Sequence, residues 1–172
     1  MAKVKFVSQR GTKYSEIGCG VAALLMLMKT ADHPTPWTFV EMGDLLNVDV
    51  EPREKWGEEF SEYGKGAYAR DVTKYLDDNC ISYTCIADKD KSIISWVKLL
   101  GIIKKAPTMV GMINPKNPAE WGEGGHWVVL KKKSKNLFEC YDPYRKKYEP
   151  HSYEMEIDKL KSDWDGFAIA IT

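Results

Sequence analysis

The sequence predicts an α+β fold in which an N-terminal helical part packs on a C-terminal antiparallel sheet. Helical patterns dominate the first half of the chain, at residues 19–31, 36–46 and 67–79. Strand patterns dominate the second half, at residues 108–113, 126–132, 137–141 and 166–171. Because strands and helices do not alternate regularly, we expect no βαβ alternation. The 172 residues are expected to form one domain, 1–172, with a buried core.

The first two helices are predicted from their helix-forming residues and from the prolines that separate them. Ala, Leu and Met dominate residues 19–31, and all three are strong helix formers. The proline-rich segment 33–36 then breaks the pattern. Thr35 can cap a second helix over residues 36–46, with Trp37, Val40 and Leu45 as candidate buried positions.

The middle of the chain carries two further helices and a strand. Apolar residues at three- and four-residue spacing predict a helix over 67–79; they are Ala69, Val72, Tyr75 and Leu76. Residues 81–87 read as a strand, and Asp90 can cap a helix over 93–103. The acidic segment 47–65 also contains aromatic residues. This segment can form either the rim of a cleft or an insertion that packs on itself, and we favour the insertion.

Two loops separate the later strands. Residues 114–125 are rich in Pro, Gly and Asn and form a loop before the strand at 126–132. Asp142-Pro143 marks a turn after the strand at 137–141. The lysines of 131–135 are expected on a solvated hairpin face, which can attract an acidic partner.

Charge and hydropathy exclude several classes of protein. Basic and acidic residues each number 25, so the net charge is zero, which argues against a nucleic-acid partner. The longest apolar run, residues 21–28, is far shorter than the ~20 residues that span a bilayer. No signal peptide is visible at the N-terminus. We therefore expect a cytoplasmic protein without membrane insertion, and the sequence does not indicate its oligomeric state.

The four cysteines do not form a recognisable framework. They are too few for a disulfide scaffold, and a reducing compartment would leave them as thiols. Cys80 and Cys85 lack further ligands at the spacing of a zinc site and are predicted to be buried thiols. We expect no metal and no cofactor.

Cys19 is the first candidate functional residue. It lies between Gly18 and Gly20 where the first predicted helix begins. The free N–H groups and positive dipole end of a helix N-terminus lower the pKa of a thiol. The flanking glycines permit close approach of a substrate backbone. Without further residues, a small buried cysteine at a helix start is the commoner interpretation.

Three other residues can act with this thiol. His126 opens a strand after a glycine-rich loop, and an imidazole there can pair with a thiolate and protonate a leaving amine. If the strands at 126–132 and 137–142 form a hairpin, Asp142 lies beside His126 and can orient its ring. Gln9, the only glutamine, can share an oxyanion hole with the backbone N–H of Cys19. Taken singly, each also fits an ordinary structural role.

In combination these residues resemble the papain-like cysteine peptidases, and more closely the bacteriocin-processing, double-glycine peptidases. The order is Gln, Cys, His, Asp. The matching segments are Gln9, GCGVAALLMLM at 18–28, GGHWVVL at 124–130, YDPY at 141–144 and WDGFAIAI at 164–171. The resemblance covers residues 9–171 apart from the section 32–65.

The resemblance implies roles for four residues. Cys19 would be the nucleophile, His126 the general base and acid, Asp142 the residue that orients His126, and Gln9 a donor to the oxyanion. The implied protein is a papain-like cysteine peptidase of bacterial or phage origin. It would hydrolyse a peptide or amide bond in a peptide or protein through a thioester acyl-enzyme.

Two alternatives keep the same fold. An acyltransferase or amidase would use the same Cys-His-Asp residues, as arylamine acetyltransferases and transglutaminase-like proteins do. A non-catalytic binding protein would retain the fold alone. An intact set of Cys19, His126 and Asp142 argues against the binding protein, because a pure binder does not need all three.

Overall fold

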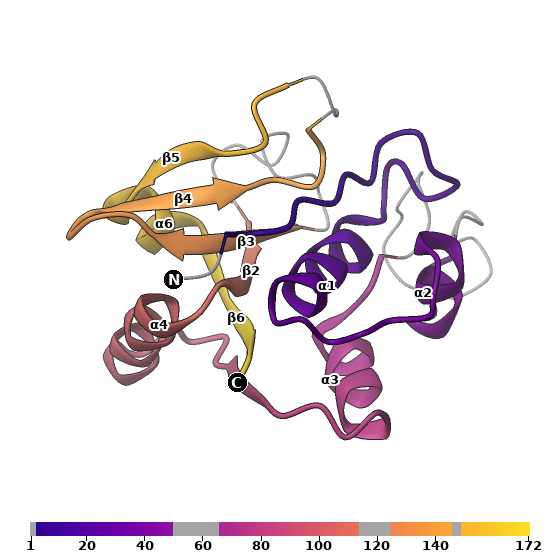
Figure 1. The fold of residues 1–172 in the computed structure, drawn as a ribbon. Helices are drawn as coiled ribbons and strands as arrows, with labels where there is room; N and C mark the ends of the chain where they lie inside the picture. Colours follow the sequence, from indigo (N-terminus) through magenta and orange to yellow (C-terminus); the bar gives the residue numbers. More distant parts are fainter. Residues whose placement is uncertain (1–2, 50–65, 114–124, 146–148) are drawn as a thin grey trace, which may run out of the picture.

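A computed structural model of the chain describes residues 3–49, 66–113, 125–145 and 149–172 (Figure 1). The acidic segment predicted at 47–65 therefore lies almost wholly outside the described residues. The same holds for the loop predicted at 114–125, apart from its last residue. Within the described parts of the chain, no helix is long and apolar enough to cross a membrane.

The helices lie on two sides of one sheet (Figure 1). On one side are α1 (Cys19–Thr30), α2 (Phe39–Leu45) and α3 (Ala69–Asp78). On the other side are α4 (Ile93–Lys105) and α6 (Ile157–Asp163). The predicted α+β arrangement, with the helix that begins at Cys19 packed on an antiparallel sheet, is confirmed.

The sheet has six strands in the order β1-β6-β2-β3-β4-β5, and every neighbouring pair is antiparallel. The strands are β1 (Tyr83–Ala87), β2 (Thr108–Met112), β3 (His126–Lys132), β4 (Leu137–Tyr141), β5 (Tyr153–Glu156) and β6 (Trp164–Ile171). Both β1 and β2 pair with β6, so they run parallel to each other and α4 connects them. The expectation of no βαβ alternation was therefore wrong for this part of the chain.

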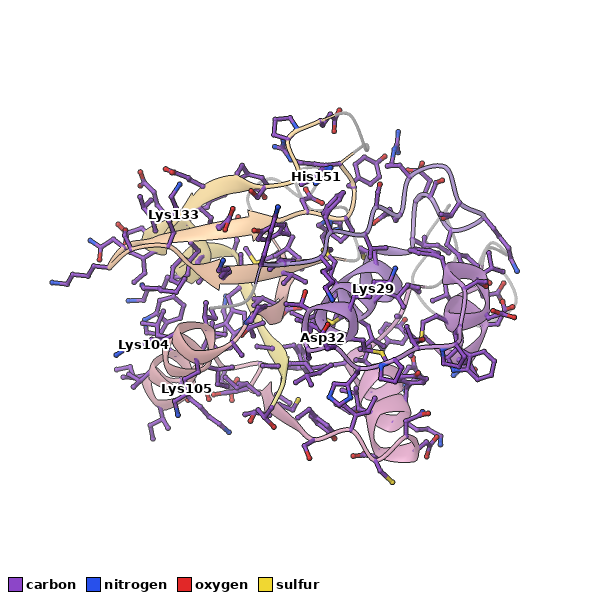
Figure 2. The ribbon with its side chains drawn as sticks, viewed as in Figure 1. Lys29, Asp32, Lys104, Lys105, Lys133 and His151 are labelled. Carbon is purple, nitrogen blue, oxygen red and sulfur yellow. The ribbon has the colours of Figure 1, made fainter. Side chains whose placement is uncertain are left out.

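Side chains alternate across the sheet and divide the core into two halves. Met109, Val129 and Ile169 face α1. Val110, Val128 and Ala168 face α4 and α6. Every residue of α1 except Lys29 is buried, which explains why this helix is apolar all round. Lys29 is among the charged side chains on the surface (Figure 2).

Helix α2 begins three residues later than predicted. Thr38 rather than Thr35 is the N-cap: its hydroxyl accepts from the Glu41 N–H, and the Glu41 carboxylate accepts from the Thr38 N–H. Met42 and Leu46, four residues apart on one side of the helix, are the residues that pack into the core. The prediction that Trp37, Val40 and Leu45 are buried was wrong, since all three are exposed.

Three further expectations need correction. Helix α4 is capped by Ser92, whose hydroxyl accepts from the Ser95 N–H, and not by Asp90. The prediction that Cys80 and Cys85 are both buried was wrong: Cys80 lies in the turn after α3 with a positive φ and is exposed, and Cys85 in β1 is half-buried. Strand β5 and helix α6 were not predicted. Their charged sequence, YEMEIDKLKSD, carries no clear apolar period.

Candidate active site

Cys19 is the first residue of α1, and no side chain caps this end of the helix. A Cβ on Gly18 would lie 2.7 Å from the carbonyl oxygen of Tyr14, and one on Gly20 would lie 2.8 Å from the Cβ of Ala67. Both neighbours are therefore glycine because other chain segments pass close to them. The first-turn N–H groups of a helix point outward and favour a negative charge at Cys19.

His126 and Asp142 are brought together by the pairing of β3 with β4. The strands are in register at Val129 and Tyr141, so the start of β3 lies beside the residue that follows β4. His126 Nε2 lies 2.7 Å from Asp142 Oδ1. The side chains are 11% and 19% exposed, so this pair is shielded from water. The hairpin geometry predicted from the sequence is therefore present.

The Asp142 carboxylate is itself held in place. Its Oδ1 also accepts from the backbone N–H of Tyr144 at 2.9 Å. Burial raises the pKa of Asp142, but the hydrogen bond and positive charge of His126 outweigh burial and hold the pKa below its usual range. Asp142 is therefore ionised at neutral pH and stabilises a protonated His126 ring.

Cys19 and His126 form a coupled pair. Burial raises the pKa of the Cys19 thiol. The charge of His126, a hydrogen bond to its ring and the backbone N–H groups of Trp127 and Gly20 together outweigh burial, so the pKa lies below its usual value. Burial lowers the pKa of His126, while Cys19 and Asp142 raise it above its usual range. The arrangement favours a thiolate next to an imidazolium. Since Asp142 takes Nε2, the ring nitrogen left for Cys19 is Nδ1.

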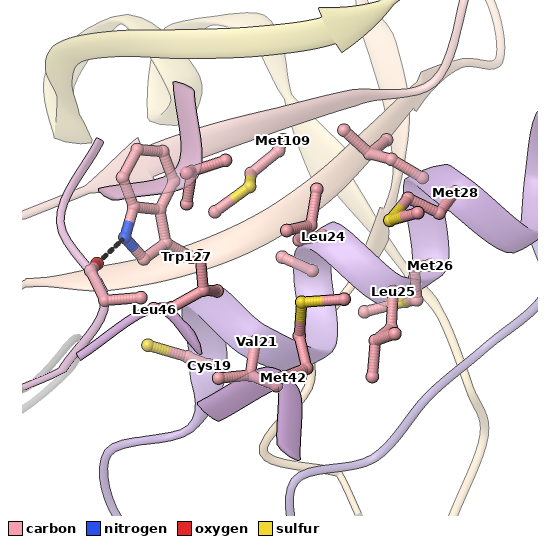
Figure 3. Packing of buried hydrophobic residues seen from close by; sticks show 14 of the residues in the cluster. Cys19, Val21, Leu24, Leu25, Met26, Met28, Met42, Leu46, Met109 and Trp127 are labelled. Atoms are coloured by element: carbon pink, nitrogen blue, oxygen red, sulfur yellow. Dashed lines mark hydrogen bonds between the residues drawn. The ribbon is translucent and has the colours of Figure 1, made fainter. Parts of the chain in front are cut away.

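Trp127 connects the two sides of this site. Its indole N–H donates to the carbonyl of Ala67 at 3.0 Å, and its ring covers Gly20. Figure 3 shows Cys19 at one edge of its apolar cluster, with the sulfur directed away from Met42 and Leu24. Trp127 is 9% exposed and forms part of the core beside the thiol.

Gln9 lies in the loop that is hydrogen-bonded to the turn after Asp142. Its backbone N–H donates to the carbonyl of Pro143 at 2.9 Å, and its side-chain Nε2 donates to the carbonyl of Ser15 at 2.7 Å. The residue is fully buried, and among the described residues its Oε1 has no hydrogen-bond partner. The bond to Ser15 uses one of the two N–H groups of the amide.

A cluster at the surface of this loop was missed by sequence reasoning. The Tyr144 hydroxyl donates to Glu16 Oε2 at 2.8 Å, and Arg10 lies 3.2 Å from Glu16 Oε1. The Arg10 guanidinium also lies 4.3 Å from the centre of the Tyr144 ring. Tyr144 belongs to the YDPY motif, but nothing in the sequence pointed to its partners.

Other histidine and cysteine side chains lie in different environments. The ring of His151 stacks on Phe6 with the ring centres 4.5 Å apart. Burial raises the pKa of the thiols of Cys85 and Cys140, which makes both poor nucleophiles at neutral pH. No group of His, Cys, Asp and Glu side chains within the described ranges is arranged to hold a metal ion.

The fold is similar to that of solved peptidase domains. No family model and no curated protein sequence matches the chain. A solved double glycine motif protease from an AMS/PCAT transporter, in complex with the leader peptide, is 15% identical with a TM-score of 0.61, covering 98% of this chain and 91% of that one. Two structures of the ComA peptidase domain of Streptococcus mutans, one with a small-molecule inhibitor, are 18% identical. Their TM-scores are 0.54 and 0.52, and each alignment covers 98% of both chains. The expected likeness to double-glycine peptidases is therefore confirmed at the level of the fold.

Proposed function

We propose that this chain is a cysteine peptidase that cleaves a peptide bond through a thioester acyl-enzyme. The observation that carries the proposal is the alignment of three groups: Cys19 at the start of α1, His126 beside it, and Asp142 2.7 Å from the second ring nitrogen of His126. This is the arrangement of a nucleophile, a proton carrier and a residue that orients the carrier.

The mechanism follows from the protonation states. The Cys19 thiolate attacks the carbonyl carbon, and the carbonyl π electrons move onto the oxygen. The backbone N–H of Cys19 and the second N–H of the Gln9 amide are the proposed donors to this oxyanion. The intermediate collapses, the C–N bond breaks, and His126 gives its Nδ1 proton to the leaving amine.

Hydrolysis then completes the cycle. Neutral His126 takes a proton from water, and the resulting hydroxide attacks the thioester carbonyl. The C–S bond breaks, the carboxylic acid leaves, and the thiolate–imidazolium pair is restored. Asp142 keeps Nε2 of His126 protonated throughout, so that the other ring nitrogen, Nδ1, always faces the sulfur.

The proposed substrate is a peptide. The transporter-derived protease with the same fold was solved with a leader peptide, which makes peptides that end in two glycines the first ones to test. The test is cleavage of such peptides followed by mass spectrometry, with a search for an adduct of the acyl fragment on Cys19. Cys19→Ala should abolish cleavage, whereas the matched variant Cys80→Ala should retain it. Equal cleavage by both variants would overturn the proposal.

Acyl transfer remains the second candidate, because Cys19 and His126 are both shielded from water. Cys19 is 9% exposed, and limited access of water favours attack on the thioester by an amine or thiol. The product separates the two reactions: a free acid indicates a peptidase, and a product that contains an added nucleophile indicates a transferase. A non-catalytic binding protein would give neither product and no acyl adduct.

A further inference from the structure

The outer face of α4 exposes large aliphatic side chains. Ile93 and Ile94 are 82% and 81% exposed, and Val97 is 61% exposed. Leu99 and Ile103 already bury the opposite side of α4 against the sheet. The three aliphatic side chains are therefore not needed for the core, and a folded protein gains nothing by leaving them in water.

Lysines surround this apolar face. Lys98, Lys104 and Lys105 lie on the exposed side of the same helix, and Lys91 precedes it. Within the ranges that the structure describes, none of the four takes part in an ion pair. Figure 2 shows Lys104 and Lys105 at the end of the molecule away from α2. The basic region extends onto the β3–β4 hairpin, where the charge of Lys104 contributes to lowering the pKa of Lys132.

The acidic residues nearby do not neutralise this face. Asp88 and Asp90 lie before the helix, where Lys89 and Lys91 offset their charges, and α4 itself contains no acidic residue. Lys91 also lies near the carboxylate of Asp165, so the lysines in excess are those of α4. Because the whole chain has no net charge, the excess of lysine here is a local segregation of charge. The face therefore complements a partner that is apolar and negatively charged.

We propose that the outer face of α4 docks on the surface of an anionic lipid bilayer. Aliphatic side chains on the convex side of a helix can enter the boundary between headgroups and acyl chains, while lysines extend their stems and keep their charges among the headgroups. A second copy of the chain is a poorer partner, because its own lysines would face these lysines. Isoleucines that stand out from a helix also offer no groove for a protein ligand.

The docked orientation leaves the candidate active site open. Helix α4 covers the side of the sheet opposite to α1, so Cys19, at the start of α1, is on the far side of the sheet from the bilayer. Docking would hold the protein at the membrane without blocking access to the thiol. The proposal does not depend on peptidase activity.

The test is co-sedimentation of the full chain with vesicles of phosphatidylcholine alone or with 30% phosphatidylglycerol. We expect binding only to the anionic vesicles, and weaker binding at high salt because counter-ions screen the lysines. Each lysine near an anionic surface contributes about a five-fold change in partitioning. Lys98→Glu/Lys104→Glu/Lys105→Glu should therefore reduce binding at least 100-fold. Ile93→Ser/Ile94→Ser/Val97→Ser should reduce it at least ten-fold.

The matched control is Val40→Ser/Leu45→Ser, which removes exposed aliphatic side chains from α2 and should leave binding unchanged. Circular dichroism of each variant checks that it is folded. The proposal is overturned if the wild-type chain does not sediment with anionic vesicles, or if the α4 and α2 variants bind equally. It is also overturned if the α4 variants instead abolish a concentration-dependent dimer, or binding of an acidic helical peptide, with no change on vesicles.

Discussion

The hydroxyl of Tyr144 donates a hydrogen bond to Glu16 at 2.8 Å, and this contact joins the turn after Asp142 to the loop before Cys19. The backbone bond from Gln9 to Pro143 joins the same two segments. Two sides of the candidate active site are therefore fixed to each other by contacts that do not include the reacting groups.

Removing this contact should loosen both segments. We expect Tyr144→Phe to lower the free energy of unfolding by about 0.5–1 kcal/mol, since the hydrogen bond involves a charged acceptor but is exposed. Urea denaturation measures the change. A double-mutant cycle with Glu16→Ala, which removes the acceptor, should give a coupling energy of similar size. Additive effects of the two substitutions would contradict the assignment.

Cys19 should react as a thiolate below neutral pH. Its pKa lies below the usual value, because His126 and backbone N–H groups outweigh the effect of burial. Alkylation by iodoacetamide, followed residue by residue with mass spectrometry, should therefore stay fast at Cys19 as the pH falls below 7. In His126→Ala this reactivity at low pH should disappear.

Exposed Cys80 provides the internal reference for that experiment, because it reports reagent quality and pH effects unrelated to the site. If the profile of Cys19 is the same in wild type and His126→Ala, no thiolate–imidazolium pair exists and the catalytic proposal fails.

Asp142→Asn should lower the pKa of His126. Asp142 is one of the groups that raise this pKa above its usual range, so its loss makes the imidazolium release its proton at lower pH. We expect the alkaline limb of kcat/KM for the cleaved peptide to move to lower pH, and kcat/KM to fall at least ten-fold.

The control for this substitution is Glu139→Gln, which changes a carboxylate on the same strand β4 away from His126. It should leave the pH profile unchanged. An unaltered alkaline limb in Asp142→Asn would show that the carboxylate does not control the ring.

Asp165 should make stability depend on pH. Burial raises its pKa to about 6, above the ordinary value of about 3.9, so the folded state holds this proton more tightly than the unfolded chain. Its contribution is fully present below pH ~4 and is lost as pH rises through 6, in total about 3 kcal/mol. In Asp165→Asn this loss should be absent, while the amide oxygen can still accept from the Phe167 N–H.

Urea denaturation of both proteins at several values between pH 4 and pH 7 measures the effect. Taking the difference between the two proteins cancels the contributions of other carboxylates. A difference that does not change with pH would refute the assigned pKa shift.

Local patterns were sufficient to predict the elements that carry the site. Helix α1 could be predicted from its own apolar, helix-forming residues, and β3 and β4 from their own strand-forming residues. His126 and Asp142 could be placed side by side because a hairpin fixes which ends of its strands meet. That residues 1–172 form a single domain stays a prediction, as do the chemical roles of the four site residues.

Contacts between distant segments could not be predicted in this way. Nothing periodic links Gln9 to Pro143 or Glu16 to Tyr144, because each bond depends on where two irregular loops pass each other. The position of β6 between β1 and β2 likewise depends on tertiary packing. Thr38 and Glu41 have the spacing of a capping box, but Thr35, three residues earlier, is an equally suitable N-cap residue by type, and the sequence alone does not decide between them.

The central position of β6 has a consequence for biosynthesis. Strands β1 and β2 have no partner between them until residues 164–171 have left the ribosome, so the sheet beneath α1 cannot close during most of translation. Pairing over such long sequence separations is slow. A nascent chain would therefore carry Cys19 without the finished framework that lowers the pKa of the thiol, and its reactivity would arise only after residues 164–171 have emerged and paired with β1 and β2.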